Sequence, residues 1–340
     1  MAEQINRKWL VAAYPDGMPT AETFELAEEP APTAGPGEIV VRNIWLSVDP
    51  YMRARISDRA SYAAPVAVGD VMVGGTVAQV VASNSHLYSV GEVIVTQGGW
   101  QDYCLLGPAQ QDASYRVDRA LPLSCSLGVT GMPGATAYFG LLRLGKPSAG
   151  DTLVVSAAAG AVGSVVGQIG KMHGCRVVGI AGGPEKCGLC TDTFGFDACL
   201  DYKAEEDLAA SLQQACPDGI DIYFENVGGP VLEAVAPLLK DGSRAPICGF
   251  ISQYNELALQ PPWDVINSLG KRIESRFFLV SEWLGEMPKA RRELSTWVQE
   301  GKLTYRESVA KGLEKAPEAF IGVLTGRNIG KQVVRISATH

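Results

Sequence analysis

One segment, residues 151–186, constrains the fold of this chain most strongly. It reads DTLVVSAAAGAVGSVVGQIGKMHGCRVVGIAGGPEK. The apolar run at residues 153–156 is too short for a helix and predicts a buried parallel strand. Apolar residues then recur at helical spacing over residues 161–173, and residues 175–181 predict a second strand. The order of strand, turn, helix and strand therefore predicts a βαβ unit.

The turn in this unit carries the small residues of a G-x-G-x-x-G fingerprint, with alanine in the first place. The three small positions are Ala158, Gly160 and Gly163. Small residues allow a dinucleotide to approach the backbone at Gly160 and the helix to pack closely at Gly163. The helix start would then face a pyrophosphate with its N–H groups. A glycine turn alone also suits a tight loop in any α/β protein, but the complete unit predicts a dinucleotide site.

The end of the second predicted strand indicates which dinucleotide binds. NAD enzymes usually carry an acid there, which grips the ribose 2′-hydroxyl. Here the window at residues 181–184 reads AGGP, and Lys186 follows shortly after it. One charge-assisted hydrogen bond to a 2′-phosphate contributes about 1.5–3 kcal/mol, which is roughly a ten- to hundredfold preference for NADPH.

Composition excludes several classes of protein. The chain has 340 residues, enough for two domains, and its net charge of −8 argues against a nucleic-acid or anionic-membrane partner. No apolar run approaches the length of a membrane span. The first residues lack a signal-peptide pattern. Eight cysteines are spread along the chain, as in reduced cytoplasmic proteins, so we expect a cytoplasmic location.

Two patterns divide the chain. Up to about residue 125, strand-like runs at residues 38–47, 71–81 and 92–96 are separated by Pro and Gly turns, which predicts a mostly antiparallel, barrel-like domain. From about Gly128 onward, strands and helices alternate. Besides the two strands already described, this region has strand-like runs at residues 198–200, 220–225, 245–251 and 273–280.

Six strands in such alternation predict a doubly wound parallel sheet. The remaining tail has a strand-like stretch near Ser308, a predicted helix at residues 317–324 and a last predicted strand at residues 332–336. We expect this tail to return to the first domain.

No metal site is predicted. Cys187 and Cys190 form a C-x-x-C pair, but a zinc site needs a second pair or histidines at a compatible spacing. The histidines are His86, His173 and His340, and none has a plausible set of partner ligands. A catalytic zinc is therefore not expected.

Several motifs in order connect the chain with a known family. It resembles the zinc-independent medium-chain dehydrogenase/reductases, in the branch of prostaglandin reductase, leukotriene B4 dehydrogenase, 2-alkenal reductase and curcumin reductase. The resemblance covers nearly the whole chain. It rests on the motifs SVDPYMR (residues 47–53), GVTGMPGATAYFGLL (128–142), AAAGAVGSVVGQIGK (157–171), FENVGG (224–229), CGFISQYN (248–255) and GRNIGKQVV (326–334).

The resemblance implies a GroES-like, mostly-β catalytic domain at residues 1–128 and a Rossmann NADP(H)-binding domain at residues 129–301. Residues 302–340 would return to the catalytic domain. It also implies a homodimer, with sheet edges meeting through residues 273–280. Arg276 in that segment could contact substrate, or it could be a solvated or interface charge.

The resemblance also implies which residues bind NADP(H). Lys186 and Tyr202 would meet the 2′-phosphate, Asn226 would lie near the cofactor, and Asn328 would touch it from the tail. Tyr254 would lie beside the nicotinamide ribose. The remaining expected cofactor contacts are Gly160, Ala161, Val162 and Gly163 at the pyrophosphate, with Cys248, Gly249, Phe250, Ile251, Phe278, Leu279 and Val280 on the nicotinamide side.

Without a metal or an acid–base histidine, the predicted reaction needs little activation of its substrate. Reduction of the C=C bond of an α,β-unsaturated aldehyde or ketone fits: hydride reaches the β-carbon and an enolate oxygen is stabilised. Tyr254 is the predicted stabilising donor, although it could instead only hold the cofactor. Tyr51 is the second catalytic candidate, either in the substrate wall or in the core.

Other functions remain open at this point. A quinone reductase or a zinc-free ketone reductase could use the same scaffold. A dinucleotide-binding fold can also serve a protein that binds NADPH without catalysis. The sequence does not identify the physiological substrate.

Overall fold

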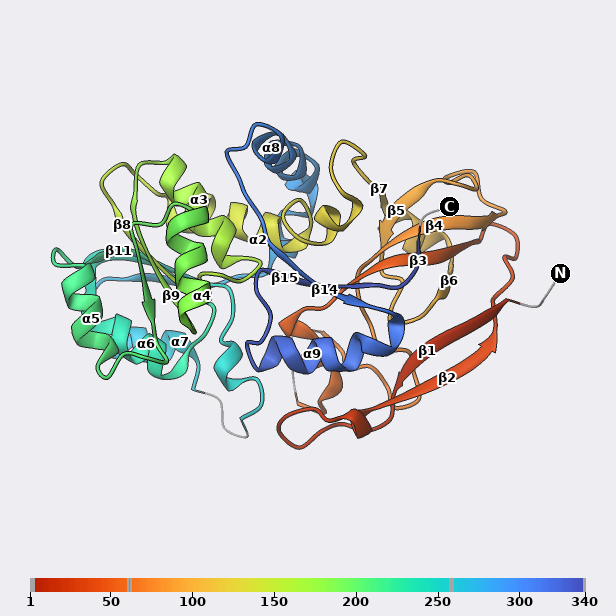
Figure 1. Ribbon diagram of the computed structural model, residues 1–340, viewed down its shortest axis with the longest axis horizontal. Helices are drawn as coiled ribbons and strands as arrows, with labels where there is room; N and C mark the ends of the chain where they lie inside the picture. The colour runs from red at the N-terminus through yellow and green to blue at the C-terminus, as the bar shows by residue number, and fades with distance from the viewer. Residues whose placement is uncertain (1–3, 60, 62, 257–259, 339–340) are drawn as a thin grey trace. The chain divides into compact units, whose positions relative to one another are not determined.

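The computed structural model describes residues 4–59, 61, 63–256 and 260–338. The chain divides into two compact units. One unit comprises Met1–Gly128 and Glu307–His340, and the other comprises Val129–Arg306. Each unit is built around its own sheet and is treated separately below (Figure 1).

The unit Val129–Arg306 contains a parallel sheet that has six strands in the described part of the chain. Their order is β10-β9-β8-β11-β12-β13, and each neighbouring pair is parallel. This is the doubly wound order of dinucleotide-binding domains, so the prediction of such a sheet is confirmed. The strands are β8 (Thr152–Ser156), β9 (Arg176–Ala181), β10 (Ala198–Asp201), β11 (Ile220–Phe224), β12 (Leu239–Ile247) and β13 (Glu274–Phe277).

Helices cover both faces of this sheet, which explains its continuous apolar runs. On one face, α3 (Gly163–Met172) packs on β8 and β9. The other face shares a hydrophobic cluster with three helices: α5 (Leu208–Ala215), α6 (Gly229–Val235) and α7 (Pro262–Asn267). The remaining helices of the unit are α2 (Met132–Phe139), α4 (Pro184–Gly188) and α8 (Met287–Gln299) (Figure 1).

Two predicted strands extend too far at their carboxyl ends. β12 ends at Ile247 rather than at Ile251, and β13 ends at Phe277 rather than at Val280. After β12 the Cys248 amide donates to the Glu225 carbonyl oxygen at 2.9 Å, as part of an isolated parallel bridge between Glu225 and Ile247, and the Gly249 amide donates to the same oxygen at 3.3 Å. Because two successive amides share this one acceptor, the regular ladder stops after the bridge, although the side chains are apolar enough for a strand.

The other unit is mostly antiparallel, as predicted. Its larger sheet has the order β14-β15-β3-β4-β5-β7, and β6 also pairs with β3. Of its pairings, β14 with β15 is parallel and the rest are antiparallel. The strands are β3 (Ile39–Ser47), β4 (Thr76–Ser83), β5 (Val93–Thr96), β6 (Tyr103–Leu106), β7 (Tyr115–Arg116), β14 (Glu307–Lys311) and β15 (Lys331–Arg335), and the helices are α1 (Pro108–Asp112) and α9 (Ala316–Leu324).

β4 begins later than the sequence predicts. The predicted strand starts at Val71, but Val71 makes only an isolated bridge with Leu10, and the continuous pairing starts at Thr76. Gly74 separates the two stretches. A Cβ atom at Gly74 would lie 2.7 Å from Leu46 Cδ1, so the chain passes there too close to β3 for a side chain.

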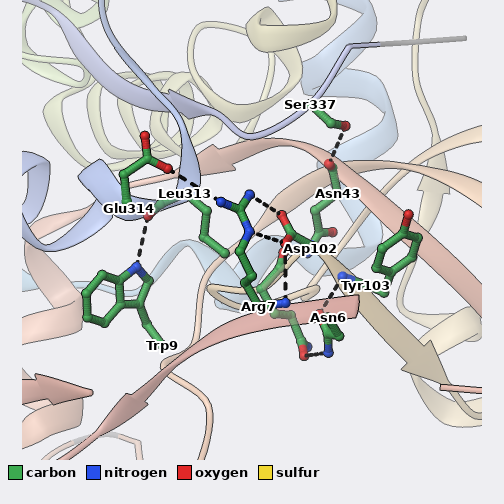
Figure 2. Close-up of polar contacts among 10 residues, drawn as sticks. Asn6, Arg7, Trp9, Asn43, Asp102, Tyr103, Leu313, Glu314 and Ser337 are labelled. Atoms are coloured by element: carbon green, nitrogen blue, oxygen red, sulfur yellow. Dashed lines mark hydrogen bonds and ion pairs between the residues drawn. The ribbon is translucent and has the colours of Figure 1, made fainter. Parts of the chain in front are cut away.

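Hydrogen bonds tie the two ends of the chain into this unit (Figure 2). β1 (Ile5–Val11) forms a hairpin with β2 (Phe24–Pro30). In β1, Arg7 forms an ion pair with Asp102 at 2.7 Å, and the Trp9 indole donates to the Leu313 carbonyl oxygen at 2.9 Å. In the tail, the Ser337 hydroxyl donates to the Asn43 carbonyl oxygen at 2.8 Å. The tail thus returns to the first unit, where β15 pairs with β3.

Candidate functional site

The turn between β8 and α3 has the geometry of a phosphate cradle. Ala157 has a left-handed backbone with φ 50°, and the Gly160 amide donates to its carbonyl oxygen at 2.9 Å. A Cβ atom at Gly163 would lie 2.4 Å from that same oxygen, so this position requires glycine. Ala161 and Val162, between these two glycines, are half-buried.

The amino end of α3 is suited to an anion. Among the described residues, no side chain caps this helix at Val162. Helix starts carry unpaired N–H groups and a partial positive charge, which attract phosphate. The turn therefore fits the pyrophosphate of a dinucleotide.

A second group of residues lies at the carboxyl end of β9. A Cβ atom at Gly182 would lie 2.9 Å from Tyr202 Cε1 and 2.9 Å from Lys203 Cε, so both side chains lie over this glycine. Lys186 follows from α4. The structure thus brings the predicted pair Lys186 and Tyr202 to one strand end, and it adds Lys203.

The electrostatics of this group favour an anion. Burial lowers the pKa of Lys186, and the positive charge of Lys203 lowers it further. An anionic ligand would relieve the repulsion between the two ammonium groups. The nearby Asp201 carboxylate accepts hydrogen bonds from the Gly183 amide at 2.7 Å and the Lys203 amide at 3.1 Å. Sequence reasoning missed Lys203, whose only signal was a basic residue just after a predicted strand.

The crevice of this sheet lies between the carboxyl ends of β8 and β11, where the strand order reverses. The Asn226 side-chain amide donates to the Ser156 carbonyl oxygen at 2.7 Å, and its backbone amide donates to the Ser156 hydroxyl at 2.8 Å. Ligands of doubly wound sheets bind at this switch point. Asn226 therefore lies at the switch point, and its contact with the cofactor stays a prediction.

The segment after β12 reaches the same crevice. The Ile251 amide donates to the Asn226 carbonyl oxygen at 3.1 Å. A Cβ atom at Gly249 would lie 2.7 Å from the Tyr254 hydroxyl oxygen, so the hydroxyl packs directly on this glycine. The Phe250 ring meets the Tyr254 ring edge to face, at a centroid distance of 5.5 Å. The segment 248–254 is thus held against Asn226.

The predicted contacts after β13 differ in exposure. The Phe278 side chain is buried and packs edge-on against Phe224 and Trp283. Its side chain therefore belongs to the core, and only its backbone could face a ligand. Leu279 and Val280 are half-buried. Arg276 forms an ion pair with Glu282.

Comparisons with known proteins agree with this architecture. Residues 7–113 match a family model described as the N-terminal domain of oxidoreductase, and residues 161–294 match one described as zinc-binding dehydrogenase. The chain is 49% identical to the NADPH-dependent curcumin reductase of Escherichia coli K12, covering 98% of both chains. It is 41% identical to the NADP(+)-dependent 2-alkenal reductase of Nicotiana tabacum, covering 99% of both.

A solved structure matches as well. CurA from Vibrio vulnificus, in complex with NADPH, is 49% identical and superimposes with a TM-score of 0.92, covering 98% of this chain and 99% of that one. The chain belongs to the medium-chain dehydrogenase/reductase family. Its relatives place it in the curcumin and 2-alkenal reductase branch.

Two predicted site residues of this family member lie in the other unit. Tyr51 lies in a 3-10 segment, Pro50–Ile56, and its half-buried side chain packs on a hydrophobic cluster that includes Met52 and Phe320. The Asn328 side-chain amide donates to the Gly330 carbonyl oxygen at 2.8 Å. Their roles toward substrate and cofactor stay predictions.

In this medium-chain reductase, Cys187 of the C-x-x-C pair has Cys199 as a close neighbour. The Cys187 sulfur lies 3.1 Å from that of Cys199, and all eight cysteines are free thiols. Within the described residues, no group of three or more His, Cys, Asp or Glu side chains could hold a metal ion. His340 lies outside those residues. No helix in the described part of the chain is long and apolar enough to cross a membrane.

Proposed function

We propose that this chain catalyses the NADPH-dependent reduction of the C=C bond of α,β-unsaturated aldehydes or ketones. The observation that carries the proposal is the Tyr254 hydroxyl, packed on Gly249 beside Asn226 at the crevice of the sheet. A phenol there can donate a hydrogen bond to a substrate oxygen. The similarity to an NADPH-dependent curcumin reductase and an NADP(+)-dependent 2-alkenal reductase supports the same reaction.

The residues of the parallel sheet fit NADPH. The turn with Gly160, Ala161, Val162 and Gly163 would hold the pyrophosphate, because no side chain caps the start of α3 among the described residues and a helix start attracts phosphate. The ammonium groups of Lys186 and Lys203 and the phenol of Tyr202 would hold the 2′-phosphate. The remaining proposed contacts would bind the nicotinamide half: Asn226, Cys248, Gly249, Phe250, Ile251, Tyr254, the Phe278 backbone, Leu279, Val280 and Asn328.

When bound, NADPH supplies the hydride that reaches the β-carbon of the substrate. Negative charge then develops on the carbonyl oxygen, and the Tyr254 hydroxyl stabilises this enolate by donating a hydrogen bond. A proton added at the α-carbon completes the saturated product. Tyr51 shapes the substrate side of the site.

The same proposal includes an assembly and a location. Among the described residues β13 is an outer strand of the parallel sheet, so its outer edge can pair with β13 of a second copy and form a homodimer. The free thiols fit a reducing, cytoplasmic environment.

The test is NADPH oxidation, measured without oxygen, with enones and 2-alkenals of increasing size, quinones and simple ketones. Product analysis distinguishes reduction at C=C from reduction at C=O. We expect saturated carbonyl products from the enones. Turnover of quinones or ketones alone, or tight NADPH binding with no turnover of any activated alkene, would refute the proposal.

A further inference from the structure

Glu225 is a fully buried carboxyl group that the proposed reaction does not use. It directly follows β11, and 0% of its surface is exposed. Its Oε1 atom accepts three hydrogen bonds, from the Ser156 hydroxyl at 2.9 Å, the Val227 amide at 2.6 Å and the Gly228 amide at 3.0 Å. A single oxygen atom thus accepts hydrogen bonds from residues on both sides of the crevice.

These hydrogen bonds span the switch point of the sheet. Ser156 ends β8, whose chain continues into the phosphate turn, and Glu225 follows β11, whose chain continues toward α6. Glu225 and Ser156 are 69 residues apart in the sequence. The contact therefore joins two loops that diverge from neighbouring strands, on either side of the crevice where dinucleotides bind.

The backbone of Glu225 extends the same network to a third segment. Its carbonyl oxygen accepts the amides of Cys248 and Gly249. The next turn continues the pattern, since the Val227 carbonyl oxygen accepts the Ser252 amide at 3.0 Å. The segment carrying Tyr254 is thus fixed to the turn that Glu225 holds.

That turn needs such a restraint. Gly228 and Gly229 both have left-handed backbones, with φ 73° and 53°. Glycine is the most conformationally free residue in the unfolded and loosely held state. By accepting the Val227 and Gly228 amides, the buried carboxyl selects one conformation of this turn.

We propose that Glu225 is a positioning residue, whose carboxyl group fixes the Asn226–Gly229 turn and the segment with Tyr254 in the shape that binds the dinucleotide. The inference rests on the proposed function only in taking these strand ends as the NADPH site. Burial raises the pKa of Glu225, which favours the neutral acid, and glutamine closely matches a neutral glutamic acid in shape. A hydrocarbon of similar size would leave the two amides without their acceptor, and it would leave the Ser156 hydroxyl only the Phe224 carbonyl oxygen, at 3.4 Å.

The test compares Glu225→Leu with Glu225→Gln by fluorescence titration with NADPH and by hydrogen exchange of the Val227 and Gly228 amides. We expect Glu225→Leu to weaken NADPH binding at least tenfold and to speed exchange at both amides. Glu225→Gln should stay within threefold of the wild type. In steady-state assays Glu225→Leu should raise the KM for NADPH more than it lowers kcat.

Asp221 offers a control near the amino end of β11, away from the crevice. Its carboxylate also ties β11 to β8, accepting the Thr152 amide at 2.9 Å. Asp221→Leu should lower the melting temperature but leave NADPH affinity within threefold. Should Glu225→Leu fail to fold, Ser156→Ala removes the hydroxyl partner and should weaken NADPH binding several-fold.

Wild-type NADPH affinity in Glu225→Leu, or equal losses of affinity in Asp221→Leu, would overturn the inference. The inference would also fail if Glu225→Gln bound NADPH as weakly as Glu225→Leu does. If Ser156→Ala is used instead, wild-type NADPH affinity in that variant would overturn the inference. Because binding is measured without substrate, a wild-type protein that binds NADPH but reduces no enone refutes the proposed function alone. A wild-type protein that does not bind NADPH refutes both.

Discussion

The ammonium group of Lys331 lies 2.6 Å from the carboxylate of Asp49, with only 4% and 6% of the two side chains exposed. Lys331 also donates to the Val48 carbonyl oxygen at 2.7 Å. Lys331 begins β15 in the tail, and Asp49 immediately precedes the segment with Tyr51. This buried pair therefore joins the returning tail to the segment that we propose shapes the substrate side.

Lys331→Met should destabilise the protein strongly, because it leaves the Asp49 carboxylate buried without its counter-charge. Breaking a buried pair in this way costs about 3–5 kcal/mol. Urea unfolding should show this loss. Lys302→Met is the control, since its ion pair with Glu300 is exposed and should contribute less than about 1 kcal/mol. Equal, small losses in both variants would contradict the prediction.

Lys186→Ala should reduce the preference for NADPH over NADH by about tenfold or more, since a charge-assisted hydrogen bond contributes about 1.5–3 kcal/mol. Lys203→Ala should reduce it as well, but less, because Lys203 is exposed. The measurement is kcat/KM with each cofactor, with Lys302→Ala as control. If Lys186→Ala keeps the full preference, Tyr202 or another donor binds that phosphate.

Tyr254→Phe should lower kcat about a hundredfold or more, the usual effect of removing one oxyanion donor. The phenyl ring retains the packing on Phe250, so NADPH affinity should change only a few-fold. Steady-state kinetics with an enone and an NADPH titration separate the two effects. Turnover within a few-fold of wild type, with only affinity altered, would show that Tyr254 merely holds the cofactor.

Tyr51→Ala should shift the preference among enones of different size while NADPH binding stays unchanged. The reason is that the substitution removes a ring from the proposed substrate side and leaves the unit Val129–Arg306, with the proposed NADPH site, unchanged. The measurement is kcat/KM over an enone series. An unchanged order of preference would assign Tyr51 to the hydrophobic cluster alone.

Glu225 should make the protein less stable as the pH rises from acid toward neutrality. Burial raises its folded pKa above the unfolded value of about 4.3, so folding takes up a proton between the two values. The stabilisation is complete below the unfolded pKa and is lost as the pH rises through the folded pKa. Thermal unfolding across this range should show a flatter pH dependence for Glu225→Gln; identical profiles would contradict the prediction.

The sequence by itself determined the elements whose signals are local. The apolar run of β8, the glycine turn and the helical spacing of α3 lie within one short segment, and each follows from the conformational preferences of neighbouring residues. The alternation of strands and helices likewise predicted the parallel sheet. Strand ends were less predictable, because the residues after Ile247 are apolar enough for a strand, yet the ladder ends in one isolated bridge where the Cys248 and Gly249 amides share the Glu225 carbonyl oxygen.

Only the tertiary structure decided which distant residues meet. Lys203 lies over Gly182 because β10 pairs with β9, and Cys187 has Cys199 as a neighbour for the same reason. Glu225 reaches Ser156 because β11 lies next to β8, although six elements separate these strands along the chain. Local patterns do not encode strand order, which depends on how helices pack on both faces of the sheet. The nucleotide turn could thus be predicted from one segment, whereas the residues that hold the crevice in shape could not.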